Sequence, residues 1–238
     1  MLYLSLLSLP RHHPRWQFLQ PYDLHRLLMC VLPDRHDSDD VPRLLYRHEE
    51  HDDAHSVLVQ TPVSPNWAML NGAAEVKVKS FDPRRISDGT RYRFKLRANP
   101  VVKRRGGYFS DGKPRHVLVG SHNEWVKEQT GVEPLSREQQ LISWLEAKGQ
   151  GGRPGVSSGF ELLQQERNSQ MVPACVVGPA HTYSFRRANT KRPMHFIGVD
   201  FEGVLRVTDS YAFAQILHGG IGRGKAFGFG LLSLAPPR

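Results

Sequence analysis

The stretch RYRFKLRANP (Arg91–Pro100), in the middle of the chain, alternates strictly between basic and apolar side chains. The basic positions are Arg91, Arg93, Lys95 and Arg97, and the apolar positions are Tyr92, Phe94 and Leu96. Side chains of a β-strand point alternately to opposite faces, so this period of two predicts a strand with one buried face and one polar face. Such a strand requires neighbouring strands and a covering layer, which the rest of the chain must supply.

The elements predicted around this strand follow a similar order twice. Those before it are a strand at Met1–Leu9, a helix over Leu24–Val31 that ends at Pro33, and strands at Arg43–His48, Ser56–Gln60 and Ala74–Phe81. Those after it are a helix in Ser136–Gly149, two strands around a basic turn in His181–Phe196, a strand at Phe196–Val207, a helix in Thr208–Gly220 and a strand at Phe227–Leu234. We therefore expect an α+β chain of two tandem ferredoxin-like domains, residues 1–84 and 90–238, that divide near Arg84–Gly89.

Several of these elements carry signals at their ends. Ser136 stands where a helix N-cap is expected, and Gln139, three residues later, would close a capping box. Thr208 or Asp209 would cap the later helix.

The composition favours a polyanionic partner. The 32 Lys and Arg residues outnumber the 23 Asp and Glu residues, which gives a formal net charge of +9. This surplus is typical of nucleic-acid-binding proteins, although a solvated basic surface gives the same count. The chain has no apolar run of the ~18 residues that a membrane span needs, and its N-terminal MLYLSLLSLP, without a basic leader, is interpreted as a strand rather than a signal peptide. Cys30 and Cys175 are too few for a disulfide framework or a thiolate metal site, so we expect a cytoplasmic protein.

The segment HEEHDDAH (His48–His55) resembles a metal-binding motif in its spacing. His51 and His55 stand four residues apart, and Asp52 takes the place of the glutamate of a zinc metalloprotease. That motif requires a helix, which places both imidazoles on one face. Here the segment joins two predicted strands, so we interpret its charged residues as a turn that faces water and expect no metal.

The segment PYDLHRLLM (Pro21–Met29) combines an apolar stripe with two polar side chains. Tyr22 and His25 lie about 60° apart around the helix axis and point away from the centre of the stripe. Both stand near the helix start, where backbone N–H groups favour a phosphate. Histidine can exchange a proton near neutral pH, and tyrosine adds an O–H donor. On the spacing alone, the favoured interpretation is an exposed histidine and a tyrosine that packs at a helix start.

The segment HGGIGRGKAFGFG (His218–Gly230) contains six glycines and, at Gly219–Lys225, the spacing of a phosphate-binding P-loop. A P-loop places Ser or Thr after the lysine to hold magnesium and continues into a helix. Here Ala226 follows Lys225 and a strand is predicted next, which argues against a nucleotide hydrolase. Glycines can still bring the backbone close to a phosphate, or they can form a tight connection between helix and strand.

Four motifs together resemble one family. PYDLHRLLM, RFKLRANP, FEGVLRV and GIGRGKAFGFGLLSLAP occur in the same order as in the CasE family, the CRISPR repeat-processing endoribonucleases of type I-E Cascade complexes. The resemblance extends from the first strand to the last residues, and the C-terminal motif is its most specific part. The loops at Asp34–Asp53, Lys103–Gly131 and Gly149–Gly159 carry no resemblance.

The resemblance implies a metal-independent endoribonuclease that needs no cofactor. Members of the family cleave the stem-loop of the CRISPR repeat by attack of a 2′-hydroxyl on the adjacent phosphate, which leaves a 2′,3′-cyclic phosphate and a 5′-hydroxyl. They stay bound to the mature guide RNA with the other Cascade subunits. By this resemblance Tyr22 and His25 are catalytic, and which of them gives the proton and which takes it is left open. The RNA-binding residues that it implies are Arg26, Arg186, Arg187, Lys191 and Arg192 (the last four in a basic hairpin at Phe185–Met194) and Gly222, Arg223, Gly224 and Lys225 of the glycine loop.

The alternative is a subunit that binds RNA without cutting it. It would hold the guide RNA in a ribonucleoprotein, and it predicts tight binding with no cleavage product. A protein of the membrane surface would fit the charge, but the chain lacks a basic amphipathic helix.

Overall fold

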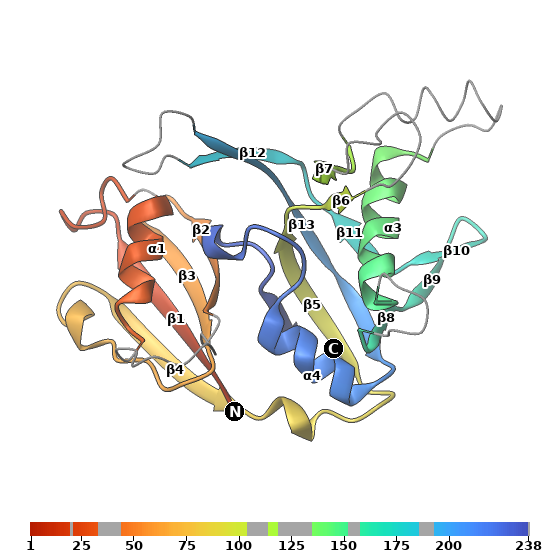
Figure 1. Ribbon diagram of the computed structural model, residues 1–238, viewed down its shortest axis with the longest axis horizontal. Coiled ribbons are helices and arrows are strands. Elements are labelled where there is room, and N and C mark those ends of the chain that lie inside the picture. Colours follow the sequence, from red (N-terminus) through yellow and green to blue (C-terminus); the bar gives the residue numbers. More distant parts are fainter. Residues whose placement is uncertain are drawn as a thin grey trace.

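The computed structural model describes residues 1–19, 21–32, 44–103, 114–118, 135–151, 158–185 and 193–237. Over these residues the chain forms an α+β fold with two larger antiparallel sheets beside each other (Figure 1). None of the helices in these ranges is long and apolar enough to cross a membrane.

The first sheet has the strand order β2-β3-β1-β4, and all neighbouring strands in it are antiparallel. Its elements are β1 (Leu2–Pro10), α1 (Pro21–Met29), β2 (Leu45–Glu50), β3 (Ala54–Thr61) and β4 (Glu75–Phe81), with 3-10 turns η1 (Ala68–Leu70) and η2 (Pro83–Arg85). Leu24 and Leu28 of α1 are fully buried in one core cluster with Leu7 and Val57 of the sheet. The apolar stripe therefore fixes which face of α1 meets the sheet.

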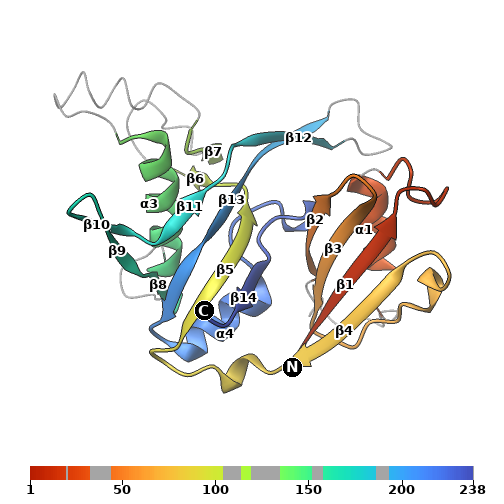
Figure 2. The same ribbon diagram turned by 180° about the vertical axis from the view of Figure 1, so that it is seen from behind.

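The second sheet follows the path β11-β13-β5-β14, and β8 and β12 also pair with β13. Its elements are β5 (Arg91–Ala98), α3 (Arg137–Gly149), β8 (Phe160–Leu162), β11 (Cys175–Val177), β12 (His181–Phe185), β13 (Met194–Val207), α4 (Ser210–Gly219), η4 (Lys225–Phe227) and β14 (Leu232–Ala235). Two small ribbons, β6 (Val101–Lys103) with β7 (Pro114–His116) and β9 (Gln164–Arg167) with β10 (Gln170–Pro173), complete the fold. Seen from behind, the strands stand in front of α1 and α4 (Figure 2).

The predicted signals at helix starts are confirmed. The Ser136 side chain accepts a hydrogen bond from the backbone N–H of Gln139, and the Gln139 side chain accepts one from the backbone N–H of Ser136. For α4 the cap is Asp209, whose carboxylate accepts from the N–H of Ala212. The alternation in β5 is confirmed as well, because Phe94 and Leu96 are buried in the core under α3 and α4.

Three predicted boundaries are wrong. Helix α1 ends at Met29 rather than at Pro33. The two strands expected on either side of Phe196 are one strand, β13, of 14 residues. The final strand begins at Leu232 rather than at Phe227, because the preceding glycines hold positive φ angles and η4 turns the chain there.

Polar contacts join the two sheets at β2, β3 and β5. Lys95 of β5 forms an ion pair with Glu49 of β2 at 3.0 Å, and the Gln60 side chain on β3 donates to the Leu217 carbonyl at the end of α4 at 2.7 Å. The basic face of β5 was expected to be the polar face, yet Arg97 on that face is largely buried, with 17% of its side chain exposed. The first sheet covers this end of β5, so the strand is enclosed on both sides there.

Candidate active site

Helix α1 presents Tyr22 and His25 beside its buried stripe. Both side chains are half-buried, whereas Arg26, which follows His25, is exposed. The sequence prediction that the two polar side chains stand away from the centre of the apolar stripe is therefore confirmed.

The glycine loop (Gly219–Gly230) connects α4 to β14 and is held against the end of β5. The N–H of Gly230 donates to the carbonyl of Arg97 at 2.7 Å, and Asn99 pairs with Arg223 in an isolated bridge. The N–H of Ile221 donates to the carbonyl of Gly230 at 2.9 Å and closes the loop on itself. Two of the motifs quoted above, RFKLRANP and the glycine-rich motif, are thus neighbours in space.

Several glycines in this loop are required by its backbone. Gly222 and Gly224 have φ angles of 81° and 83°, and Gly228 has 84°, all in the left-handed region that other residues avoid. The loop leads into η4 and then β14, so no helix follows Lys225. The structure therefore agrees with the sequence argument against a P-loop, and it gives these glycines a role in the turn itself.

His25 meets the glycine loop through Phe227. The two ring centroids lie 6.4 Å apart, and the ring of Phe227 also packs against Phe185 of β12 at 4.6 Å and Phe196 of β13 at 5.0 Å. Sequence reasoning did not select Phe227, although it stands inside the glycine-rich motif two residues after Lys225. The structure thus brings α1, the glycine loop and the strand pair β12–β13 to one place.

A cavity of about 430 Å³ lies next to this contact, between the two sheets. Its lining residues are Leu24, Tyr46, His48, Glu50, Arg97, His181, Tyr183, Phe185, Asp200, Phe227, Gly228 and Phe229. Within it the Arg97 guanidinium pairs with both carboxylate oxygens of Asp200, at 2.7 and 2.9 Å, and donates to the carbonyl of His48. Arg97 therefore links the centre of the second sheet to β2.

The His-rich turn differs from its sequence interpretation. The prediction that it joins two strands is confirmed, and His51 is exposed. The expectation that its charged residues all face water is wrong for His55, of which only 4% is exposed. In the register of β2 and β3, His55 turns inward beside His48 rather than toward His51.

The four hairpin cations Arg186, Arg187, Lys191 and Arg192 lie outside the described residues. The strands that lead to them are described, and they pair in register from His181 opposite Gly198 to Phe185 opposite Met194. The predicted pair of strands is thus confirmed, while the positions of the four side chains stay a prediction.

Comparison with known proteins gives consistent matches over the whole chain. The model of the family described as "CRISPR associated protein" matches residues 2–236. The chain is 31% identical to "CRISPR-associated endoribonuclease Cse3" of Thermus thermophilus, over 93% of both chains. It is 26% identical to "CRISPR system Cascade subunit CasE" of Escherichia coli, over 90% of this chain and 92% of that protein.

A solved structure shares the fold. It is "Structure of Thermus Thermophilus Cse3 bound to an RNA representing a pre-cleavage complex", which superposes with a TM-score of 0.74 at 31% identity and covers 99% of both chains. The chain therefore belongs to the CRISPR-associated protein family and, within it, to the CasE (Cse3) type.

Proposed function

We propose that this protein is the endoribonuclease that cuts the repeat stem-loops of precursor CRISPR RNA. The 2′-hydroxyl attacks the adjacent phosphate without a metal or a cofactor, and the products are a 2′,3′-cyclic phosphate and a 5′-hydroxyl. The protein then keeps the mature guide RNA as a cytoplasmic subunit of Cascade. The contact between His25 and Phe227 carries this proposal, because it joins α1 to the glycine loop in a chain 31% identical to a named endoribonuclease.

The topology supports two tandem ferredoxin-like domains as the scaffold. The first sheet has the order β2-β3-β1-β4 with α1 between its first two strands in the chain. The second sheet has β5 and β13 at its centre, and α4 links β13 to β14. We place the division between the domains after residue 84 and the start of the second domain at residue 90.

Tyr22 and His25 are the proton-transfer groups of the proposed reaction. Activation of the 2′-hydroxyl and protonation of the 5′-oxygen are both proton transfers, and each positioned acid or base accelerates such a reaction by about 10²–10⁴-fold. The Phe227 ring limits the orientations open to the imidazole of His25. The start of α1 adds backbone N–H groups that favour a phosphate.

The loop and the hairpin bind the RNA backbone in this proposal. The phosphate gains charge in the transition state, and nearby cations and N–H groups stabilise that charge. Arg26 and Arg223 are exposed on the two elements that meet at Phe227, and Lys225 begins η4. RNA stems are recognised mainly by shape and phosphate contacts, which suits the basic residues 186–192.

The test is cleavage of the matching repeat RNA in EDTA by the wild type and two variants. The wild type should cleave at its normal rate, His25→Ala should lose cleavage while it keeps RNA affinity, and Tyr22→Phe should slow cleavage by a smaller factor. Wild-type binding without cleavage would favour the RNA-binding subunit instead. Cleavage by His25→Ala at the normal rate would remove α1 from the active site.

A further inference from the structure

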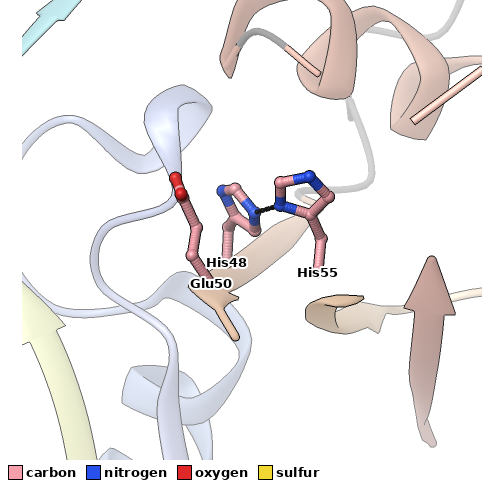
Figure 3. A group of neighbouring side chains, drawn as sticks. All are labelled: His48, Glu50 and His55. Atoms are coloured by element: carbon pink, nitrogen blue, oxygen red, sulfur yellow. Dashed lines mark hydrogen bonds between the residues drawn. The ribbon is translucent and has the colours of Figure 1, made fainter. Parts of the chain in front are cut away.

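Three side chains of the β2–β3 hairpin gather at a place that the proposed RNA chemistry does not use. His48 and Glu50 extend from β2 and His55 from β3 (Figure 3). Each offers one ligand atom, and these atoms lie within 4.8 Å of one another. Two imidazoles and a carboxylate are a ligand set that zinc and similar transition metals accept.

The hydrogen bonds of His55 fix its tautomer. Its Nε2 lies 3.2 Å from the carbonyl oxygen of Trp16, and a carbonyl can only accept, so Nε2 carries the proton. The lone pair is then on Nδ1, which lies 3.0 Å from Nε2 of His48. A metal-binding histidine characteristically donates its other ring N–H to a carbonyl or carboxylate, so His55 is already oriented as a ligand.

The spacing of the two histidines suits a metal ion with a small adjustment. Two nitrogens bound to tetrahedral zinc at about 2.0–2.1 Å lie about 3.3 Å apart, close to the 3.0 Å between His48 and His55. An ion would replace the hydrogen bond between the rings, and the His48 proton would move to its Nδ1.

Glu50 supplies the third ligand and access to solvent. Its Oε2 accepts from Nη2 of Arg11 at 2.9 Å, which orients the carboxylate and leaves Oε1 for an ion. Its side chain is 65% exposed, and Glu50 and His48 both line the cavity between the sheets. The charge of Arg11 reduces the affinity for a cation, so the site suits an ion that binds nitrogen ligands strongly rather than magnesium or calcium.

We propose that His48, Glu50 and His55 bind one divalent transition-metal ion of the zinc class, with water at the fourth position. The ion would cross-link β2 to β3, and the Trp16 carbonyl would hold His55 in place through its Nε2–H. Its role is structural, so RNA cleavage proceeds without it.

The test uses the tag-free full-length protein after metal removal, with Co²⁺ as a spectroscopic probe and Zn²⁺ as competitor. We expect one Co²⁺ per chain, visible absorption bands of four-coordinate cobalt, displacement by Zn²⁺, and a higher Tm with Zn²⁺. His48→Gln and Glu50→Gln should each weaken Co²⁺ binding at least tenfold and reduce the rise in Tm. Glu50 is exposed, so its variant tests the site even if His48→Gln folds poorly.

The matched control is His51→Ala, which removes an exposed histidine of the same turn and should leave binding unchanged. The proposal is overturned if cobalt does not saturate at one equivalent, or if Glu50→Gln binds as the wild type does. It is also overturned if His51→Ala abolishes binding, because the ion would then lie on the outer side of the turn. Repeat cleavage measured with and without Zn²⁺ separates this proposal from the proposed function: equal rates fit a structural ion, and a strict requirement for Zn²⁺ contradicts that role.

Discussion

Alanine at Gly224 should destabilise the glycine loop and slow RNA cleavage together. The residue has a φ of 83°, and an added Cβ would lie 2.9 Å from Cδ2 of Phe229 and 3.3 Å from Cδ1 of Phe196. The left-handed backbone costs a non-glycine residue about 1–2 kcal/mol, and forcing an extra carbon against packed rings costs about 1–3 kcal/mol. A total of about 3 kcal/mol corresponds to a fall in Tm of about 6–12 °C for a chain of this size.

Two other glycines separate these contributions. Gly72 has a φ of 75° with nothing within 4 Å of an added Cβ, so Gly72→Ala tests the backbone alone and should lower the Tm by about 2–8 °C. Gly219 has open space and no positive φ, so Gly219→Ala should leave the Tm unchanged or raise it slightly. Melting followed by circular dichroism gives all three values.

Cleavage supplies the second measurement. Phe196 packs against Phe227, and Phe227 against His25, so displaced rings at Gly224 should disturb α1 and the proposed catalytic side chain His25. Gly224→Ala should therefore cleave more slowly than Gly72→Ala at a temperature where both are folded. The reasoning is refuted if Gly224→Ala melts and cleaves as Gly219→Ala does. A Tm change equal to that of Gly72→Ala would show that the rings of Phe229 and Phe196 move aside without lowering the free energy of unfolding further.

Three further predictions concern the basic hairpin and the glycine loop. The double variant Arg187→Glu, Lys191→Glu should bind the stem-loop more weakly and with a flatter salt dependence. Each lost phosphate contact lowers the slope of log K against log salt by about 0.7–0.9. An unchanged slope in filter binding would place these cations away from the RNA. Lys225→Ala should weaken the RNA complex in the same assay. The wild type should show no ATP binding by calorimetry, and micromolar ATP affinity would revive the P-loop interpretation.

The parts of the fold that depend on local pattern could be predicted from the sequence. The alternation in β5, the apolar stripe of α1 and the capping box at Ser136 each act within a few residues, and all three are confirmed. The ribbon of β9 and β10 was not predicted, because Gln164–Pro173 is polar and mostly exposed and carries no buried face to set a period. The prediction divided β13 at Phe196, although its hydrogen bonding continues from the residues paired with β12 to those paired with β5.

The candidate site was predictable in its polar residues and not in its packing. Tyr22 and His25 stand out by residue type and spacing, whereas the contact of His25 with Phe227 depends on how the two sheets meet. The pairing of His48 with His55 depends on strand register, which places Glu50 opposite His55. The four-residue spacing of a helix points to His51 and His55 instead. That spacing does not follow a strand, in which side chains alternate between the two faces.

Strand β13 connects the β12–β13 hairpin directly to the middle of the second sheet. Its 14 residues span about 46 Å at the usual rise per residue. The residues Met194–Gly198 pair with β12, and Val199–Arg206 continue along β5 without a break. Asp200, the partner of Arg97, follows the segment paired with β12 by only two residues. The position of the β12–β13 pair is therefore set by the same strand that holds the Arg97–Asp200 ion pair in the cavity between the sheets.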